Sequence, residues 1–573
     1  MNTKEEKIKD YLSQNKEYHD ATMLLFEHLE ILSYDTYHET VNFILNYKNI
    51  FFKDHASGIS FFQKLIEKAS SNFKNFDIFL DICIDFVTEF KRLNLTENEL
   101  INNCNEFKIS IFYFFTKNFF SIQSIVENSF INNFIFINFL PEIRKYDQEY
   151  ADLRTKNLLA DQNNAGIKND ISFLQIVMNN PEEHIINRNL NYNPSYIHKL
   201  IRNDEIDEFQ YYLSHENIEF NYEIPFSYYE RAITADKDLS LIKVAAVYGS
   251  LRIFKFLWMH LDEIEPNLLR YAYFGKNYEI IHTCEETCSH DKVFNESIVQ
   301  GSHELIEYSF EKYKSELIDE DNENYVIDDV NDDGHFYNLK CSILIDAVFY
   351  SYYPIVAPNL LKILSIAKKE EQTIVSPDKS ILLNAIKDFN LFKFILSQRD
   401  ENVNKLACNC FFDCLRASLI FNCNDTFKFL FEYLKENINF TTFLRYGIEK
   451  NHDVANYILD CQFEEKDSNK PLIFQYMKDK IEFNDIKLAI TFYSESIVVK
   501  MIKLYEPFKI TGNIFDFVSK LKNNISKKMM ISLFNQLSSF LPRQLLLCFS
   551  ALLNDCDCSL VADAIIQKLP PKA

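Results

Sequence analysis

The chain has 573 residues, of which 47% are apolar, so it is long and apolar enough to bury a continuous core and is not a disordered chain. With only 8 glycines and 13 prolines, it lacks material for tight β-turns and for phosphate-binding loops, which favours helices joined by short polar links. The net charge of −23 opposes binding to nucleic acid, whose affinity for proteins comes largely from Lys and Arg.

The N-terminal region, residues 1–145, alternates apolar stripes at helical spacing with Asn- and Lys-rich links, which predicts helices. Its start, MNTKEEKIKDYL, is charged where a secretory signal is apolar, so we expect no export by that route. The most apolar windows, ISIFYFFTKNFF and FINNFIFINFL, are shorter than the ~18 apolar residues of a membrane span. Thirteen cysteines at irregular spacing fit reduced thiols. We therefore expect a cytoplasmic protein without a membrane span.

A repeat follows a polar connection at 146–195, in the block 196–314. Gly249, Gly275 and Gly301 lie on a 26-residue grid, and each separates a run of small and apolar residues from a second apolar run. We expect each glycine to adopt the left-handed conformation that ends a first helix and turns the chain into a second one. The pattern predicts stacked helical pairs, because one pair cannot bury its own apolar face.

Three further features recur with these turns. The first helices carry small residues where neighbouring pairs would press on them: Ala245, Ala246, Ala272, Ala347 and Ala385. The second helices carry apolar residues near their start: Ile253, Ile280 and Leu305. A serine precedes several first helices, in the place of a helix cap: Ser240, Ser342 and Ser380. We interpret all of these as structural positions of the repeat.

The segment from Ser240 to Trp258, SLIKVAAVYGSLRIFKFLW, resembles the T-P-L-H-x-A-A-x-x-G-H-x-x-I-V-x-x-L-L unit of ankyrin repeats. The wider block 196–310, with HKLIRNDEIDEFQYYLS, IPFSYYERAI and LRYAYFGKNYEIIH, resembles the degenerate ankyrin-like domain expanded in paralogous protein families of protozoan parasites. Residues 121–147 resemble the helical region before that domain. The resemblance implies an all-α fold, an elongated α-solenoid of ankyrin-like helical hairpins, and a role in binding proteins.

This sequence departs from the ankyrin pattern in two ways. Leu241 and Lys243 replace its Pro and His, so the polar network that the histidine makes between repeats is not carried over. The 26-residue spacing is shorter than the ~33 residues of ankyrin repeats, which suggests that the protruding β-turn fingers are trimmed.

Beyond the first repeats we expect an acidic loop at 315–340, further degenerate repeats at 341–514, and capping helices at 515–573. Within the loop, Asp329-x-Asn331-x-Asp333-Gly334 matches the first half of a calcium loop, but Lys340 stands where a bidentate Glu is needed. We therefore interpret 316–335 as a solvated loop that could dock a basic partner.

His282, Cys284, Cys288 and His290 form the pattern H-x-C-x-x-x-C-x-H, which could chelate zinc at the end of a second helix. A second ligand pair is missing, so we favour ordinary packing with free thiols and expect no metal or cofactor. We interpret the remaining clustered cysteines in the same way: Cys408, Cys410, Cys414, Cys556 and Cys558.

No G-x-G-x-x-G, Walker, H-E-x-x-H or G-x-S-x-G pattern occurs, and we expect no enzyme. We expect a non-catalytic protein–protein interaction scaffold that presents its repeat surface to protein partners. The alternative is a ubiquitin-ligase substrate adaptor, because LPRQLLLCFSALLNDCDCSLV, 541–561, faintly resembles the first helices of an F-box. Partner identity and oligomeric state are not encoded in any pattern that we find.

Overall fold

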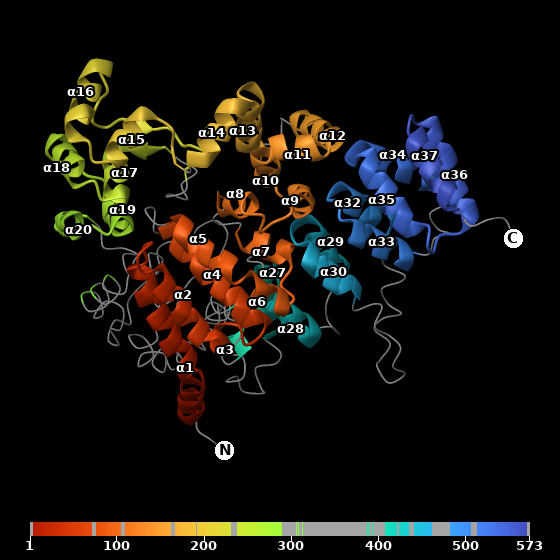
Figure 1. The fold of residues 1–573 in the computed structure, drawn as a ribbon, viewed down its shortest axis with the longest axis horizontal. Coiled ribbons are helices and arrows are strands. Elements are labelled where there is room, and N and C mark those ends of the chain that lie inside the picture. The colour runs from red at the N-terminus through yellow and green to blue at the C-terminus, as the bar shows by residue number, and fades with distance from the viewer. Residues whose placement is uncertain are drawn as a thin grey trace. The chain divides into compact units, whose positions relative to one another are not determined.

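The computed structural model of the chain describes residues 4–71, 76–104, 109–161, 167–190, 192–230, 238–288, 407–420, 423–434, 440–460, 482–505 and 513–569, and the single residues 305, 308, 312, 386, 389, 392 and 393. These parts are mostly helical, which confirms the all-α class (Figure 1). Their two strands, β1 (Glu223–Ile224) and β2 (Leu239–Ser240), pair antiparallel. No described helix is long and apolar enough to cross a bilayer.

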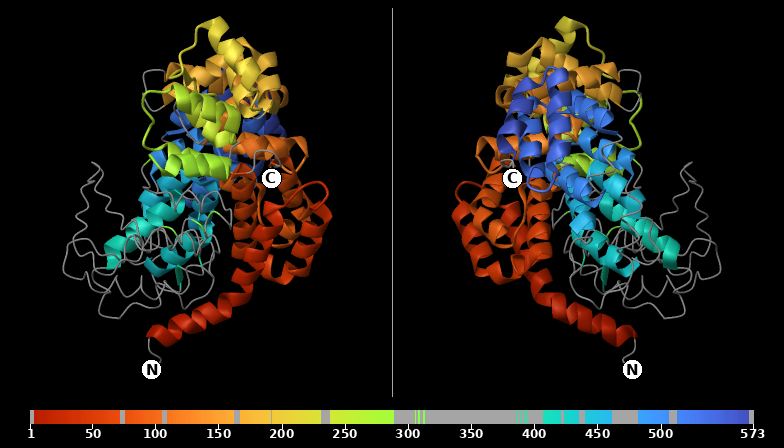
Figure 2. Two further views of the ribbon diagram at one scale, coloured as in Figure 1. Left: turned by 90° about the vertical axis from the view of Figure 1, so that its left-hand side faces the viewer. Right: turned by 90° about the vertical axis from the view of Figure 1, so that its right-hand side faces the viewer.

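The helices before residue 195 are α1 (Lys4–Glu30), α2 (Tyr37–Asn46), α3 (Lys48–Phe51), α4 (His55–Ser71), α5 (Phe76–Asp85), α6 (Val87–Arg92), α7 (Glu97–Asn103), α8 (Ile109–Thr116), α9 (Ile122–Ser129), α10 (Asn133–Asn138), α11 (Leu140–Tyr146), α12 (Gln148–Ala160), α13 (Lys168–Asn179) and α14 (Pro181–Leu190). The helices after it are α15 (Tyr196–Arg202), α16 (Ile206–Glu216), α17 (Leu241–Tyr248), α18 (Leu251–His260), α19 (Leu268–Gly275), α20 (Tyr278–Glu285), α27 (Ala407–Ile420), α28 (Asn424–Leu434), α29 (Phe440–Lys450), α30 (His452–Asp460), α32 (Phe483–Thr491), α33 (Glu495–Leu504), α34 (Ile514–Asn524), α35 (Lys527–Leu537), α36 (Arg543–Asp555) and α37 (Ser559–Lys568). In the side views of Figure 2, the start of α1 projects away from α2–α5.

The chain forms two compact units. Unit 1 comprises Met1–Thr96, Cys104–Phe114 and Ile185–Cys414. Unit 2 comprises Glu97–Asn103, Phe115–His184 and Leu415–Ala573. Each unit thus combines segments that are distant in the sequence, an interleaving that the expected domain order did not include.

In unit 1, α15 to α20 form three consecutive helical pairs. The first helices α15, α17 and α19 contact one another in order, and the second helices α16, α18 and α20 do the same (Figure 1). Ala245, Ala246 and Ala272 are fully buried on the first helices, as expected of small residues between neighbouring pairs.

Unit 2 repeats this contact order with other helices. The first helices α29, α32, α34 and α36 contact one another in order, and so do the second helices α28, α30, α33, α35 and α37. The N-cap residues of the second helices α33, α35 and α37 are Ser494, Ser526 and Cys558, whose carbonyl groups accept the first backbone hydrogen bond of each helix. These three residues are 32 positions apart, a spacing that the glycine grid did not reveal.

A left-handed conformation was expected at the glycine of each turn inside a pair, and this is confirmed for Gly249 and wrong for Gly275. Gly249 has φ +64 and ends α17 in the left-handed conformation, as expected. Gly275 does not: it is the last residue of α19, and Lys276 takes the left-handed conformation with φ 52. A Cβ on Gly275 would overlap the carbonyl oxygen of Ala246, so this glycine is required for close approach of two helices. The chain also uses Asp204, with φ 54, at the turn between α15 and α16.

One local expectation ahead of α17 is wrong. Ser240 stands at the N-cap of α17, but its side chain makes no cap hydrogen bond and instead donates to Glu265 at 2.9 Å. The connection between α16 and α17, which precedes the 26-residue grid, carries the strand pair of β1 and β2, whereas the connection 261–267 inside the grid carries no strand. The other expected positions, Gly301, Ala347, Ala385, Ser342 and Ser380, lie outside the described residues.

The segment 146–195, expected as a polar connection, carries α12, α13 and α14. In unit 2, α12 packs on the turn between α34 and α35. The buried carboxylate of Asp147 accepts a hydrogen bond from the hydroxyl of Ser526, and Glu149 accepts one from the backbone N–H of Lys527 at 2.9 Å. Asn157 donates to the carbonyl of Asn523 at 3.0 Å. The part of this segment that forms α12 is therefore packed against α34 and α35 rather than a solvated link.

A buried histidine in unit 2 predicts a pH-dependent local stability. Burial lowers the pKa of His452, the first residue of α30, from 6.5 to about 4, against backbone hydrogen bonds that raise it. The unfolded state takes up a proton first as the pH falls, so stability is lost between pH 6.5 and about 4. The protection factors of the α30 amides, which are corrected for the slower intrinsic exchange at lower pH, should fall over that interval in the native protein. They should stay constant in His452→Gln, and an equal fall there would contradict the assignment.

Candidate interaction surface

Two glutamates in the loops between the helical pairs bind polar side chains of the first helices α15 and α17. Nε2 of buried His198 on α15 lies 2.9 Å from Oε2 of Glu230, whose Oε1 accepts a hydrogen bond from the Tyr248 hydroxyl of α17 at 2.9 Å. Lys243 of α17 pairs with Glu265 of the following loop. Lys243, which stands at the position of the ankyrin histidine, thus makes an ion pair with the following loop in place of the histidine's hydrogen bonds. The sequence patterns did not predict these roles of His198, Glu230 and Glu265.

The turns of neighbouring pairs are also hydrogen-bonded to each other. The Asp204 carboxylate accepts the backbone N–H groups of Arg252 and Ile253 at the start of α18, at 3.2 and 3.0 Å. One pair further on, the Asn277 amide donates to the carbonyl of Gly249 at 3.2 Å. These bonds fix the relative register of the second helices, so side chains on their outer side are held on a defined framework.

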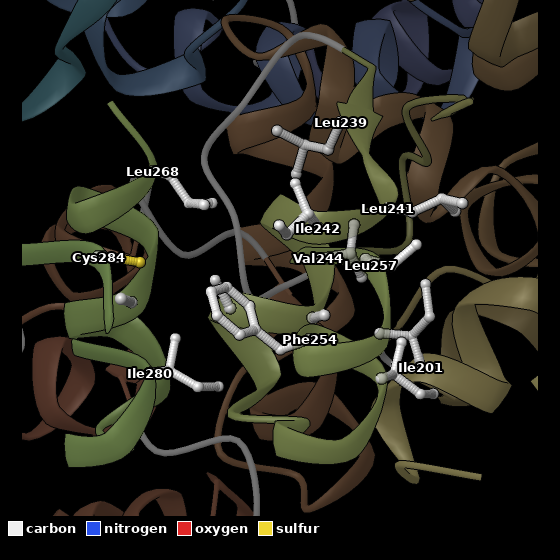
Figure 3. Packing of buried hydrophobic residues seen from close by; sticks show 14 of the residues in the cluster. Ile201, Leu239, Leu241, Ile242, Val244, Phe254, Leu257, Leu268, Ile280 and Cys284 are labelled. Atoms are coloured by element: carbon white, nitrogen blue, oxygen red, sulfur yellow. The ribbon is translucent and has the colours of Figure 1, made fainter. Parts of the chain in front are cut away.

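The expected repeat positions build the core of this framework. Ile253, Ile280 and Leu305 are fully buried in one hydrophobic cluster with the three alanines. In Figure 3, Ile280 and Cys284 of α20 face Phe254 of α18, which has α17 side chains on its other side. These residues therefore stabilise the stack and are not available to a partner.

The outer side of α16 and α18 carries an aromatic pattern. Tyr211 packs on His215 with ring centroids 5.8 Å apart, and Phe256 packs on His260 at 4.4 Å, each pair one helical turn apart. Phe256 also contacts Phe209 of α16, so the two helices are adjacent there, with Phe209 on the buried side of α16 and Tyr211 on its exposed side. We define the aromatic surface as the exposed Tyr211 and His215 of α16 and Met259 and His260 of α18, with the half-buried Phe220 and Phe256 in contact with His260.

Two residues of the aromatic surface are unusually exposed for apolar side chains. Tyr211 is 67% exposed and Met259 is 73% exposed. Exposed carboxylates on α16 and in the loops after α16 and α18 are Asp207, Glu208, Glu216, Glu219, Asp262 and Glu263. Lys255, one helical turn before Met259 on α18, is also exposed and pairs with Glu279. Exposed apolar side chains on mainly acidic elements suit a protein partner with apolar and basic groups.

The four-residue zinc pattern does not come together in the described residues. Cys284 and Cys288 are buried beside each other, whereas the His282 side chain is 58% exposed and pairs with Glu285 at 3.2 Å. In the described part of the chain, no three His, Cys, Asp or Glu side chains are grouped to hold a metal ion. His290 and the acidic segment 316–335 lie outside the described residues.

The structure describes the side chains of three of the other cysteines that the sequence singles out, and none of these three forms a disulfide. Cys414 and Cys558 are buried and Cys556 is half-buried, while the side chains of Cys408 and Cys410 lie outside the described ones. The tail 541–561 forms α36 and the start of α37, with Leu545, Leu546 and Leu553 buried in the unit 2 stack. The F-box alternative stays a prediction.

The chain matches no protein-family model, no curated protein and no solved structure.

Proposed function

We propose that the chain is a non-catalytic interaction scaffold of the cytoplasm, whose ankyrin-like helical pairs stack as an α-solenoid and bind a protein partner through the aromatic surface. The observation that carries this proposal is the pairing of Tyr211 with His215 and of Phe256 with His260 on neighbouring second helices. An aromatic pattern held on stacked pairs, with Tyr211 and Met259 exposed, is typical of a binding surface.

Binding through these residues is favourable because they bury a large surface area for a small loss of conformational entropy. Tyrosine buries a large area while few rotatable bonds are frozen, and methionine adapts its shape to an apolar partner. The hydrogen-bonded turns beneath them keep the surface ordered before binding, which lowers the entropy cost of association. The exposed carboxylates of α16 and of the loops after α16 and α18 would contribute mainly to the association rate with a basic partner, and their effect weakens as salt rises.

The test is affinity purification of the tagged full-length protein from its native cells at moderate salt. Tyr211→Ala with Met259→Ala should weaken capture of the partner by about 2 kcal/mol or more, roughly 30-fold, as for residues at the centre of an interface.

The matched control is Leu560→Ala with Ile566→Ala, which removes two exposed apolar side chains from α37 in unit 2 and should leave capture unchanged. A second variant changes the acids of 316–335 to Asn and Gln and asks whether that segment contributes. Capture that survives in the Tyr211 and Met259 variant at the native level would contradict the proposal.

A further inference from the structure

Three polar side chains on one face of α15 each keep a buried atom without a hydrogen-bond partner. The atoms are Oγ of Ser195, Nδ1 of His198 and Nη1 of Arg202, and none of them has a partner in the described part of the chain. Residues 195, 198 and 202 are three and four positions apart, so they line one side of the helix. Buried polar atoms are nearly always hydrogen-bonded in folded proteins, so three exceptions on one helix face indicate a bound group.

The contacts of these side chains bring them to the same end of α15. The Arg202 guanidinium lies 3.4 Å from the ring centroid of Tyr192, so the Arg202 side chain runs back along the helix to the residues that precede it. Ser195 stands there, where its backbone N–H donates to Oδ1 of Asn193 at 3.0 Å. His198, which is only 2% exposed, lies between Ser195 and Arg202 on the same face. The three atoms therefore border one region beside residues 192–195.

The other ring nitrogen of His198 is already bonded. Nε2 lies 2.9 Å from Oε2 of Glu230, and this oxygen also accepts the backbone N–H of Asn193 at 3.1 Å. Oε1 of Glu230 accepts the Tyr248 hydroxyl. An ionised carboxylate only accepts hydrogen bonds, so Nε2 is the donor and the ring orientation is fixed. Nδ1 therefore needs a separate partner, to which it donates when the ring is protonated.

The charges of this cluster leave one cation without a partner. Glu230 balances a protonated His198, whereas Arg202 forms no ion pair with any carboxylate that the structure describes. A guanidinium with a buried nitrogen is stabilised by an anion, to which its N–H groups donate. The hydroxyl of Ser195 is a further donor. A single unbalanced positive charge, surrounded by three side-chain donors, matches a small monovalent anion.

We propose that Ser195, His198 and Arg202 bind a halide ion, for which chloride is the probe. The ion accepts hydrogen bonds from the Ser195 hydroxyl, from Nδ1 of protonated His198 and from Nη1 of Arg202. Because His198 also bonds Glu230, which accepts from Tyr248 of α17, the ion stabilises the contact between the first two helical pairs. This site does not involve the side chains of the aromatic surface, so it goes beyond the proposed partner binding and does not depend on it.

The first test compares urea unfolding of the full-length protein in sodium chloride and in sodium gluconate at equal ionic strength, which equalises general charge screening. Fluorescence of Trp258 on α18 reports the stack that contains the site. Chloride should raise the urea midpoint above that in gluconate, and the rise should grow with chloride concentration because only the native state binds the ion. Equal midpoints at every concentration, the result expected if water serves the three atoms, would overturn the proposal.

The second test measures bound chloride from the broadening of the chloride NMR signal by the protein. Arg202→Gln should weaken chloride binding roughly 10-fold or more, because it removes the cation, and Ser195→Ala should weaken it less, because it removes a neutral donor. The matched control is Arg252→Gln on α18, which removes an exposed guanidinium that pairs with Asp204 and should leave chloride binding unchanged. Equal losses in Arg202→Gln and Arg252→Gln would show a general attraction to positive charge and would also overturn the proposal.

Discussion

Gly275→Ala should destabilise unit 1 by about 3 kcal/mol or more, because the added methyl group meets backbone atoms that cannot rotate away. The new Cβ would overlap the carbonyl oxygen of Ala246 and lie 2.8 Å from the backbone nitrogen of Gly249. Either α17 and α19 separate or the turn at Gly249 is distorted. The measurement is urea unfolding followed by fluorescence of Trp258, the single tryptophan, which lies on α18 within the same stack.

The matched control is Gly58→Ala on α4, where the nearest atom is the end of the flexible Leu93 side chain at 2.6 Å. That side chain can move, and alanine favours a helix by about 1 kcal/mol over glycine, so the unfolding midpoint should change little. If Gly275→Ala unfolds at the same urea concentration as Gly58→Ala, the close packing of α17 on α19 is wrong.

Ser526→Ala should destabilise unit 2 by about 2–3 kcal/mol, because this buried hydroxyl makes two hydrogen bonds at once. It caps α35 by accepting the backbone N–H of Met529 at 3.3 Å, and it donates to the buried carboxylate of Asp147. The substitution therefore removes a helix cap and one donor from a buried charge. Hydrogen exchange should accelerate in both α12 and α35.

Ser121→Ala is the matched control for that experiment. Ser121 caps α9 in the same way, accepting from Ser124 at 3.2 Å, but it is exposed to solvent and its other partner, Glu97, remains hydrated. Its loss should cost about 1 kcal/mol and affect α9 only. Equal effects of the two substitutions, or exchange that accelerates in α35 alone, would show that α12 is not held by Ser526.

Local patterns in the sequence were sufficient for the first repeat pairs. The left-handed Gly249 and the buried Ala245, Ala246 and Ile253 follow from spacing alone, since each depends on its own helix and the adjacent turn. Lys276 was not predictable, because the turn is imposed by helix packing on a residue with no preference for it. Gly275 fell on the expected grid, but its role depends on which backbone lies opposite.

The features that the sequence did not reveal depend on distant or weakly marked residues. The bond from Ser526 to Asp147 joins positions 379 residues apart, so no local period marks it. Ser494, Ser526 and Cys558 repeat every 32 residues as N-cap residues of helices. No glycine marks this repeat, so the glycine spacing does not predict it. The aromatic surface had one signal, an aromatic residue four positions before a histidine in two neighbouring helices, which a chain with 15% aromatic residues conceals.

The aromatic surface is tested most directly by photocrosslinking from defined positions of the full-length protein in its native cells. A photoreactive phenylalanine analogue is placed at 211 or 259, and in parallel at 515 or 560, where Phe515 and Leu560 are 66% and 69% exposed on unit 2. We expect a crosslinked partner of one mass from 211 and 259 and none from 515 and 560. Adducts confined to 515 and 560, with 211 and 259 remaining free, would contradict it.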